Sequence, residues 1–231
     1  MKQNVYDYSY EMRIERKRLI TKTFTVVVSI VLFLTLFLNF ILFPAFVKSE
    51  SMESDIAKNS AVFVTPLIRT PRRGDVVYLS RMDDYSVNGF KTVINKIVGF
   101  FTAQQIEPFG YTSSMTGKAC VRRVLALPGD TIYMQDYVLY VKKDGESLYF
   151  SEYEIAAKPY NIHIYSVPVE WDGMGVSGNF SEITMGPDQY FLLADNRIEA
   201  VDSRIYGPVD KSKIRGKVLF EYLPLNKLRF F

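Results

Sequence analysis

Residues 23–43 read TFTVVVSIVLFLTLFLNFILF, and this unbroken apolar run decides how the rest of the chain is arranged. No charged side chain occurs between Lys22 and Lys48. A helix needs roughly 20 apolar residues to cross a bilayer, whereas the apolar region of a cleaved signal sequence has about 7–15. The run ends in Phe43-Pro44-Ala45-Phe46. The sequence therefore predicts an uncleaved transmembrane anchor at residues 23–46.

Charge sets the expected orientation of this anchor. The first 22 residues carry six basic and three acidic side chains. Short basic segments stay on the cytoplasmic side, so we expect a cytoplasmic tail at 1–22 and an extracytoplasmic domain at 47–231. The predicted protein is single-pass in the cell (inner) membrane, with the lipid bilayer as a partner. Removing the tail from the chain's 28 basic and 25 acidic residues leaves 22 of each, which argues against a nucleic-acid partner.

The roughly 185 residues beyond the anchor are enough for one globular domain, and their pattern is mainly β. Short segments rich in β-branched and aromatic residues alternate with turns that contain glycine, proline and aspartate. The predicted strands are 61–65, 76–80, 121–127, 132–133, 137–141, 190–193 and 217–222. Many short strands with mixed connections indicate a folded-over antiparallel body. We expect a smaller β subdomain at about 133–188 and an insertion at 81–118.

One segment inside the insertion has the periodicity of a helix. Its apolar side chains recur at the spacing of one helix face. They are Phe90, Val93, Ile94, Ile97, Val98 and Phe101. The sequence predicts an amphipathic helix at 90–101, and two interpretations of it remain open. Either the helix packs on the β body, or it lies on the bilayer surface beside the anchor.

Cysteine and histidine each occur once, as Cys120 and His163. A single cysteine excludes an internal disulfide and a thiolate metal site, and a single histidine excludes a histidine-rich metal site. We therefore expect neither a metal nor a cofactor.

Four motif regions follow the apolar run in a characteristic order. They are SESM at 49–52, RGDVV at 73–77, RRVLALPGD at 122–130, and DNR at 195–197 followed by DSRIYG at 202–207. In this order behind an N-terminal anchor, they resemble the type I signal peptidases, which remove signal peptides from exported proteins. The resemblance covers almost the whole chain from the anchor onward, and it implies the mainly β fold of that family.

The resemblance also implies a Ser/Lys catalytic dyad. Ser51 matches the nucleophile, and its backbone N–H together with the Ser49 hydroxyl would form the oxyanion hole. A serine must lose its proton as it attacks a carbonyl carbon, and a lysine can accept that proton only when burial keeps the amine neutral. The chain thus has a candidate nucleophile a few residues beyond the predicted anchor.

The chain departs from the family pattern at the base. Arg122 occupies the position of the general-base lysine, and a guanidinium with a pKa of roughly 12.5–13.8 stays protonated in proteins. Ala200 replaces the serine that orients this lysine in the family. Glu50 replaces a glycine, and Ser54-Asp55 replaces a Pro-Thr pair. One hypothesis is that Glu50 pairs with Arg122.

Two residues are candidates for a replacement base, and neither is well placed. Lys118 lies four residues before Arg122, roughly 13 Å away along a strand. His163 lies outside the motif in which a related branch of the family carries a catalytic histidine. We expect it to be an ordinary surface or sheet residue.

The other motif residues have expected binding and structural roles. By resemblance, alanine-sized side chains of the substrate would enter shallow pockets, for which core packing is the competing interpretation. The matching residues are Val47, Ile56, Cys120 and Val121. Two ion pairs are expected to hold the active-site strands together: Arg123 with Asp195, and Asp202 with Arg204.

Two functions are compatible with this pattern. The first is a serine endopeptidase of the signal peptidase I type that cleaves signal peptides from exported preproteins at the membrane surface. The alternative is a catalytically impaired homologue that binds signal peptides or a partner peptidase, such as a second signal peptidase copy. Ser51 favours the enzyme, whereas Arg122 and Ala200 favour the binding protein. The membrane anchor argues against a self-cleaving repressor-type protease.

Overall fold

A computed structural model of the chain describes residues 5–53, 55–80, 89–106, 108–109, 120–156, 159–162, 177–197, 201–225 and 228–231. The chain divides into two compact units, Met1–Phe40 and Ile41–Phe231. The second unit holds every strand that the structure describes. We refer to it as the body.

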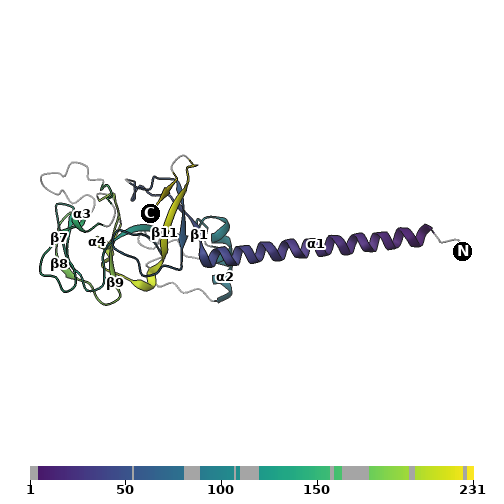
Figure 1. Cartoon of the computed structure of the whole chain (residues 1–231), viewed down its shortest axis with the longest axis horizontal. Coiled ribbons are helices and arrows are strands. Elements are labelled where there is room, and N and C mark those ends of the chain that lie inside the picture. The colour runs from purple at the N-terminus through teal and green to yellow at the C-terminus, as the bar shows by residue number, and fades with distance from the viewer. Residues whose placement is uncertain are drawn as a thin grey trace. The chain divides into compact units, whose positions relative to one another are not determined.

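The first unit consists of the long helix α1, Val5–Ile41, which is continuous in Figure 1. The predicted anchor at 23–46 extends beyond this helix, because Phe43–Val47 form the strand β1 of the body. Pro44 explains the boundary: it has no amide hydrogen and disfavours helical conformation in the residue before it. Within the described residues, no helix has an apolar stretch long enough to cross a membrane.

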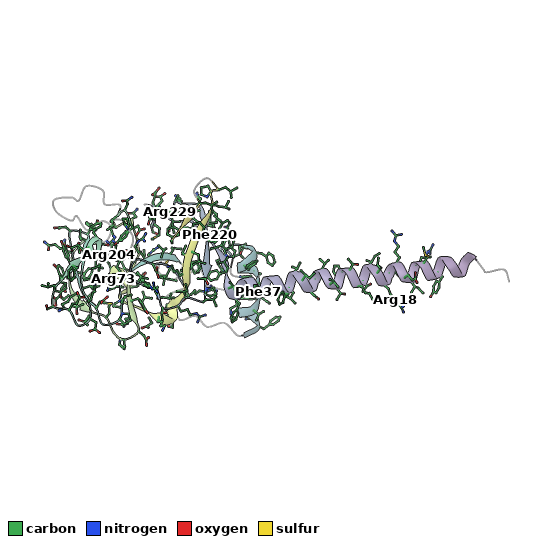
Figure 2. The ribbon with its side chains drawn as sticks, viewed as in Figure 1. Arg18, Phe37, Arg73, Arg204, Phe220 and Arg229 are labelled. Carbon is green, nitrogen blue, oxygen red and sulfur yellow. The ribbon has the colours of Figure 1, made fainter. Side chains whose placement is uncertain are left out.

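The body is mainly β, and all its strand pairings are antiparallel. The strands of the large sheet are β1, β2 (Ser60–Thr65), β3 (Val76–Leu79), β4 (Cys120–Ala126), β9 (Gln189–Leu193), β10 (Val209–Asp210), β11 (Ile214–Leu223) and β12 (Arg229–Phe230). Their order is β1-β2-β11-β3-β4-β9-β10, with β12 paired to β11. Figure 2 shows Phe220 and Arg229 close together at this last pairing.

A smaller sheet is inserted between β4 and β9. Its strands are β5 (Thr131–Gln135), β6 (Val138–Lys142), β7 (Phe150–Ser151) and β8 (Phe180–Thr184), in the order β7-β6-β5-β8. The short helix α3, Glu152–Ile155, follows β7. The predicted smaller subdomain, at about 133–188, spans most of this range. In Figure 1 the small sheet lies at one end of the body, and β1 lies at the other.

Alternation along the strands produces buried clusters on both faces of the large sheet. Val76 and Tyr78 of β3 pack in a cluster with residues of β1 and β2. Val77 and Leu79 pack on the opposite side, with residues of β4, β9, β10 and β11. A third cluster joins β4 and β9 to β5 and β6 of the small sheet. The large sheet is therefore the central layer, and it carries the candidate site residues.

Two of the sequence motifs form turns that lie against each other. Arg73 donates to Asp130 at 2.7 Å and also contacts the Leu125 carbonyl. Gly129 has a φ of 86°, and a Cβ there would lie 2.9 Å from Asp144, so the turn requires glycine. These contacts hold the ends of β3 and β4 in register.

The predicted amphipathic helix is present as α2, Gly89–Phe101. Phe100 of this helix packs against the cluster of β1 and β2, beside the buried Gly99. After the helix, the Ala103 carbonyl accepts a 2.9 Å hydrogen bond from the Phe46 N–H of β1. The outer part of the predicted apolar face is exposed, with Phe90 at 78% and Phe101 at 66%.

Candidate active site

Ser51 lies in the loop that joins β1 to β2. The loop is held by backbone hydrogen bonds, from Ile56 N–H to the Met52 carbonyl at 2.7 Å and from Asn59 N–H to the Val47 carbonyl at 2.8 Å. The Ser51 carbonyl accepts a 2.9 Å hydrogen bond from the Asn196 N–H, which follows β9. The Met52 side chain is fully buried in the core. It therefore anchors the loop at the residue next to Ser51.

The Ser51 hydroxyl has two described side-chain neighbours. Its Oγ lies 2.8 Å from the Ser49 Oγ and accepts a 2.8 Å hydrogen bond from Arg122 Nη1. Ser49 is exposed, whereas Ser51 is 8% and Arg122 5% exposed. The structure thus brings together the predicted nucleophile, the predicted oxyanion-hole hydroxyl and the residue at the base position.

Arg122 is surrounded by neutral acceptors. Its Nη1 donates to the Val121 carbonyl at 2.5 Å, and its Nε and Nη2 donate to the Val201 carbonyl at 3.2 and 2.8 Å. No carboxylate among the described residues forms an ion pair with it. A buried guanidinium is therefore held beside Ser51 by hydrogen bonds alone, without a counter-charge in the described part of the chain.

The hypothesis that Glu50 pairs with Arg122 is wrong. Glu50 pairs with Lys58 at 2.8 Å on the surface of the loop. Their side chains are about half exposed, because Glu50 points outward from a loop whose inner side is occupied by Met52. Glu50 raises the pKa of Lys58 by a hydrogen bond and by its charge, which keeps that lysine protonated.

Tyr206 is also close to Arg122, and its hydroxyl is buried. Burial raises the pKa of the Tyr206 phenol, and the neighbouring Cys120 acts in the same direction. The phenol therefore stays protonated at neutral pH and does not serve as a proton acceptor for Ser51.

The ion pair expected between Arg123 and Asp195 is present, with two hydrogen bonds of 2.8 and 2.6 Å. Arg123 also donates to Asp55 at 2.6 Å, and Arg229 of β12 contacts Asp55 at 3.0 Å. Burial acts to lower the pKa of Arg123, but Asp195 and Asp55 outweigh it and raise the pKa. The sequence gives a signal for Asp55, where an acid replaces the family's threonine, but no signal for its partners.

The second expected pair, Asp202 with Arg204, is also present, at 2.9 and 2.7 Å. Asp202 caps the short helix α4, Ser203–Tyr206, by accepting from the Arg204 N–H, and it accepts from the Ala194 N–H after β9. Arg204 donates to the Arg197 carbonyl at 2.6 Å. These bonds fix the backbone around Val201, the residue whose carbonyl holds Arg122.

Sequence reasoning missed a buried cluster next to this region. Arg197 and Glu152 are both fully buried and pair at 2.5 Å. Glu152 also accepts from the Tyr160 hydroxyl at 2.6 Å and from the Leu139 N–H at 2.9 Å. The Arg123 guanidinium lies over the Tyr160 ring, 4.3 Å from its centroid. Because Glu152 is 45 residues from Arg197 in sequence, no local pattern indicates the pair.

The residues predicted to line substrate pockets are mostly inside the body. Val47, Ile56 and Val121 belong to one buried cluster with Met52. Cys120 is partly buried and packs with a different cluster, because neighbouring residues of β4 face opposite sides. Their contact with a peptide stays a prediction.

Several sequence predictions fall outside the described residues. These concern Ser54, Lys118, His163 and Ala200. Within the described residues, no group of three or more histidine, cysteine, aspartate or glutamate side chains could hold a metal ion. Ser51 also has no lysine or carboxylate as a hydrogen-bond partner there.

Comparison with known proteins places this arrangement in a family. The family model described as "Signal peptidase, peptidase S26" matches residues 20–223. Signal peptidase I of Bacillus licheniformis is 34% identical over 112 residues, which cover 47% of this chain and 53% of the relative. Signal peptidase I of Bacillus amyloliquefaciens is 25% identical over 195 residues, which cover 83% and 81%. The chain spans about half the length of the first of these relatives and most of the second.

A solved structure is also similar. The crystal structure of a signal peptidase I from Enterococcus faecalis matches with a TM-score of 0.34 and 20% identity, over 64% of this chain and 95% of that one. The family model, which extends over most of the chain, shows that this protein belongs to the signal peptidase family, peptidase S26.

Proposed function

We propose that this chain binds the signal peptides of exported preproteins and does not hydrolyse them through Ser51. Membership of the signal peptidase family supports the ligand class. We infer the lack of hydrolysis from the 2.8 Å hydrogen bond that Arg122 Nη1 donates to Ser51 Oγ. The group at the base position is a donor toward the hydroxyl that a peptidase would have to deprotonate.

The chemistry of arginine explains why this contact opposes hydrolysis. A guanidinium has five N–H donors and no acceptor, and it is not deprotonated in proteins. Arg122 therefore stabilises the Ser51 oxygen as an acceptor and offers no site for its proton. Ser49, the other neighbour, is a neutral hydroxyl and a weak base, so proton transfer from Ser51 lacks a driving force.

A second function, signal-peptide hydrolysis by Ser51, is favoured by a different observation. The Ser49 and Ser51 hydroxyls lie 2.8 Å apart, so the predicted oxyanion donor is next to the predicted nucleophile. Hydrolysis would require a proton acceptor other than Arg122. In the absence of one among the described contacts of Ser51, we rank this function second.

We further propose that the chain acts at the cell membrane with its body on the extracytoplasmic side. The charge-free run at 23–43 and the basic tail before it support a single anchor in this orientation. The exposed Phe90, Val93 and Phe101 of α2 support contact of this helix with the bilayer surface. A second signal peptidase copy is the partner that a non-hydrolysing homologue would accompany.

The test compares binding with cleavage in one preparation. The full chain is purified in detergent and mixed with a preprotein and with the same protein lacking its signal peptide. We expect pull-down of the preprotein only, with no cleaved product on a gel. Cleavage that disappears in a Ser51→Ala variant would establish the second function instead. Equal retention of both forms of the preprotein would exclude signal-peptide recognition.

A further inference from the structure

We propose that Ser49, Ser51 and Arg122 form a binding site for the free α-carboxylate of a peptide, so that the chain retains peptides that have already been cut. This inference rests on the proposed binding of signal peptides and specifies which end of the peptide occupies the site. The ligand class is a peptide with an unblocked C-terminus after a small residue such as alanine.

The two serine hydroxyls carry one proton more than the hydrogen bond between them uses. Ser49 and Ser51 have two O–H protons, and the 2.8 Å hydrogen bond between their oxygens uses one of them. The only other described contact of either hydroxyl is the N–H of Arg122, which donates. One O–H is therefore left to donate to a ligand oxygen. The site offers donors, which suits a ligand that brings only acceptors.

Arg122 brings a nearly buried positive charge to the site. Arg122 is 5% exposed and is held by the carbonyls of Val121 and Val201 and by Ser51. These are neutral oxygens, and no carboxylate in the described part of the chain balances the guanidinium. A buried charge is costly unless it is paired, and arginine with carboxylate is the pairing with the best geometry and strength. A ligand that carries its own carboxylate would supply the counter-charge that the described residues do not provide.

Nearby arginines provide an internal comparison. Arg123, the next residue, is paired with Asp195 and Asp55. Arg204 is paired with Asp202. The fold thus supplies carboxylates to the arginines around the site and leaves Arg122, the one in contact with Ser51, without one in the described residues.

The proposed site extends from the protein surface to the nearly buried guanidinium of Arg122. Ser49 is exposed, whereas Ser51 and Arg122 are nearly buried. The hydrogen bond from Arg122 polarises the Ser51 hydroxyl and, through it, the Ser49 hydroxyl, so the O–H that remains free is a stronger donor toward the surface. An internal peptide bond arriving there brings a neutral carbonyl, whereas the end of a cut peptide brings an anion. The donor arrangement favours the cut end.

The test measures the affinity of matched peptides for the full chain in detergent by fluorescence anisotropy. The probe is a fluorescein-labelled peptide with a leucine-rich stretch that ends in Ala-Leu-Ala, with either a free carboxylate or a C-terminal amide. We expect the carboxylate form to bind at least about 10-fold more tightly, the magnitude of one charge-assisted hydrogen bond. Arg122→Gln should abolish this preference, and Arg122→Lys should retain it.

Two different failures are distinguishable. Equal dissociation constants for the two peptides on the native chain would overturn this inference and leave the proposed peptide binding intact. Binding of neither peptide would overturn both. Urea unfolding of Arg122→Gln in the same detergent, compared with the native chain, checks that the variant still folds. A carboxylate preference that persists in Arg122→Gln would also count against Arg122 as the determinant.

Discussion

The guanidinium of Arg122 donates a 2.8 Å hydrogen bond to the hydroxyl of Ser51. The two residues are 71 positions apart in sequence and are joined because the β1–β2 loop lies against β4. Where the resemblance to the family predicts a lysine that accepts the Ser51 proton, this chain has a group that only donates. The first three predictions concern this contact and the buried ion pairs of the body, and the fourth concerns an exposed hydrogen bond between Tyr149 and Glu182.

Restoring the dyad should create a peptidase. The double variant Arg122→Lys/Ala200→Ser is expected to cleave a preprotein at least about 100-fold faster than the native chain, the usual contribution of a general base. The rate should rise with pH, because only the neutral form of the introduced lysine accepts the Ser51 proton. Cleavage is followed on gels between pH 6 and 10. A matched triple variant that adds Ser51→Ala should be inactive.

The buried pair of Arg123 and Asp195 should stabilise the body. Asp195 is fully buried and accepts two hydrogen bonds from Arg123, so Asp195→Asn should lower the free energy of unfolding by about 3 kcal/mol. Urea unfolding of the full chain in detergent measures the change. The control is Glu146→Gln, which removes an exposed 3.5 Å pair with Lys143 and should cost less than about 0.5 kcal/mol. Equal effects of the two variants would contradict the prediction.

Glu152 and Arg197 should show strong coupling in a double-mutant cycle. Both are fully buried, and two Arg197 nitrogens, Nε and Nη1, have no hydrogen-bond partner among the described residues. Glu152→Gln should cost about 3–5 kcal/mol because it leaves an unpaired buried cation. Adding Arg197→Met should recover at least half of that loss.

The control for this cycle is Glu154→Gln, in the same helix α3 but exposed. Its cost should be small and should not change when Arg197→Met is added. If the effects of Glu152→Gln and Arg197→Met were simply additive, the buried pair would not be an energetic unit.

The Tyr149 phenol should lose its proton at a higher pH than an ordinary tyrosine. The hydrogen bond from its hydroxyl to Glu182, at 2.6 Å, raises the pKa of Tyr149 to about 12, with smaller contributions from burial and the Glu182 charge. A phenol whose folded-state pKa is raised holds its proton longer than in the unfolded chain. The stability that it contributes is therefore present below pH 10 and is lost as pH rises toward 12.

Nuclear magnetic resonance of ring-labelled tyrosine, with Tyr149→Phe for assignment, follows this titration. Glu182→Gln should move the midpoint of Tyr149 down toward 10, whereas Glu154→Gln, which contacts Ser151 instead, should not. An unchanged midpoint in Glu182→Gln would show that the hydrogen bond is not the cause.

Much of the fold could be predicted from local patterns. Each segment predicted as a strand coincides largely with an observed strand, from β2 to β11, and the amphipathic helix is present as α2. The strands that were missed lack a periodic signal. The strands β7, β10 and β12 are two residues long, and β8, whose sequence is FSEIT, has no strict alternation of apolar and polar residues. Strand β1 continues directly from the apolar run, so the predicted anchor at 23–46 includes all of β1 except Val47, and Pro44 is the local signal of the boundary.

The sequence by itself determined the chemistry available at the site. It shows Ser51 behind Ser49, arginine where the family has lysine, and alanine where the family has serine. Only the tertiary structure decided which hydrogen-bond and ion-pair partners these side chains have. Arg122 contacts Ser51 and the Val201 carbonyl rather than Glu50, Asp55 joins Arg123, and Glu152 joins Arg197. These contacts depend on which loops a folded sheet brings together, and residues distant along the chain carry no periodic signal of that proximity. The identity of a residue sets which hydrogen bonds its side chain can donate or accept. The packing of the folded chain sets which atoms are its partners.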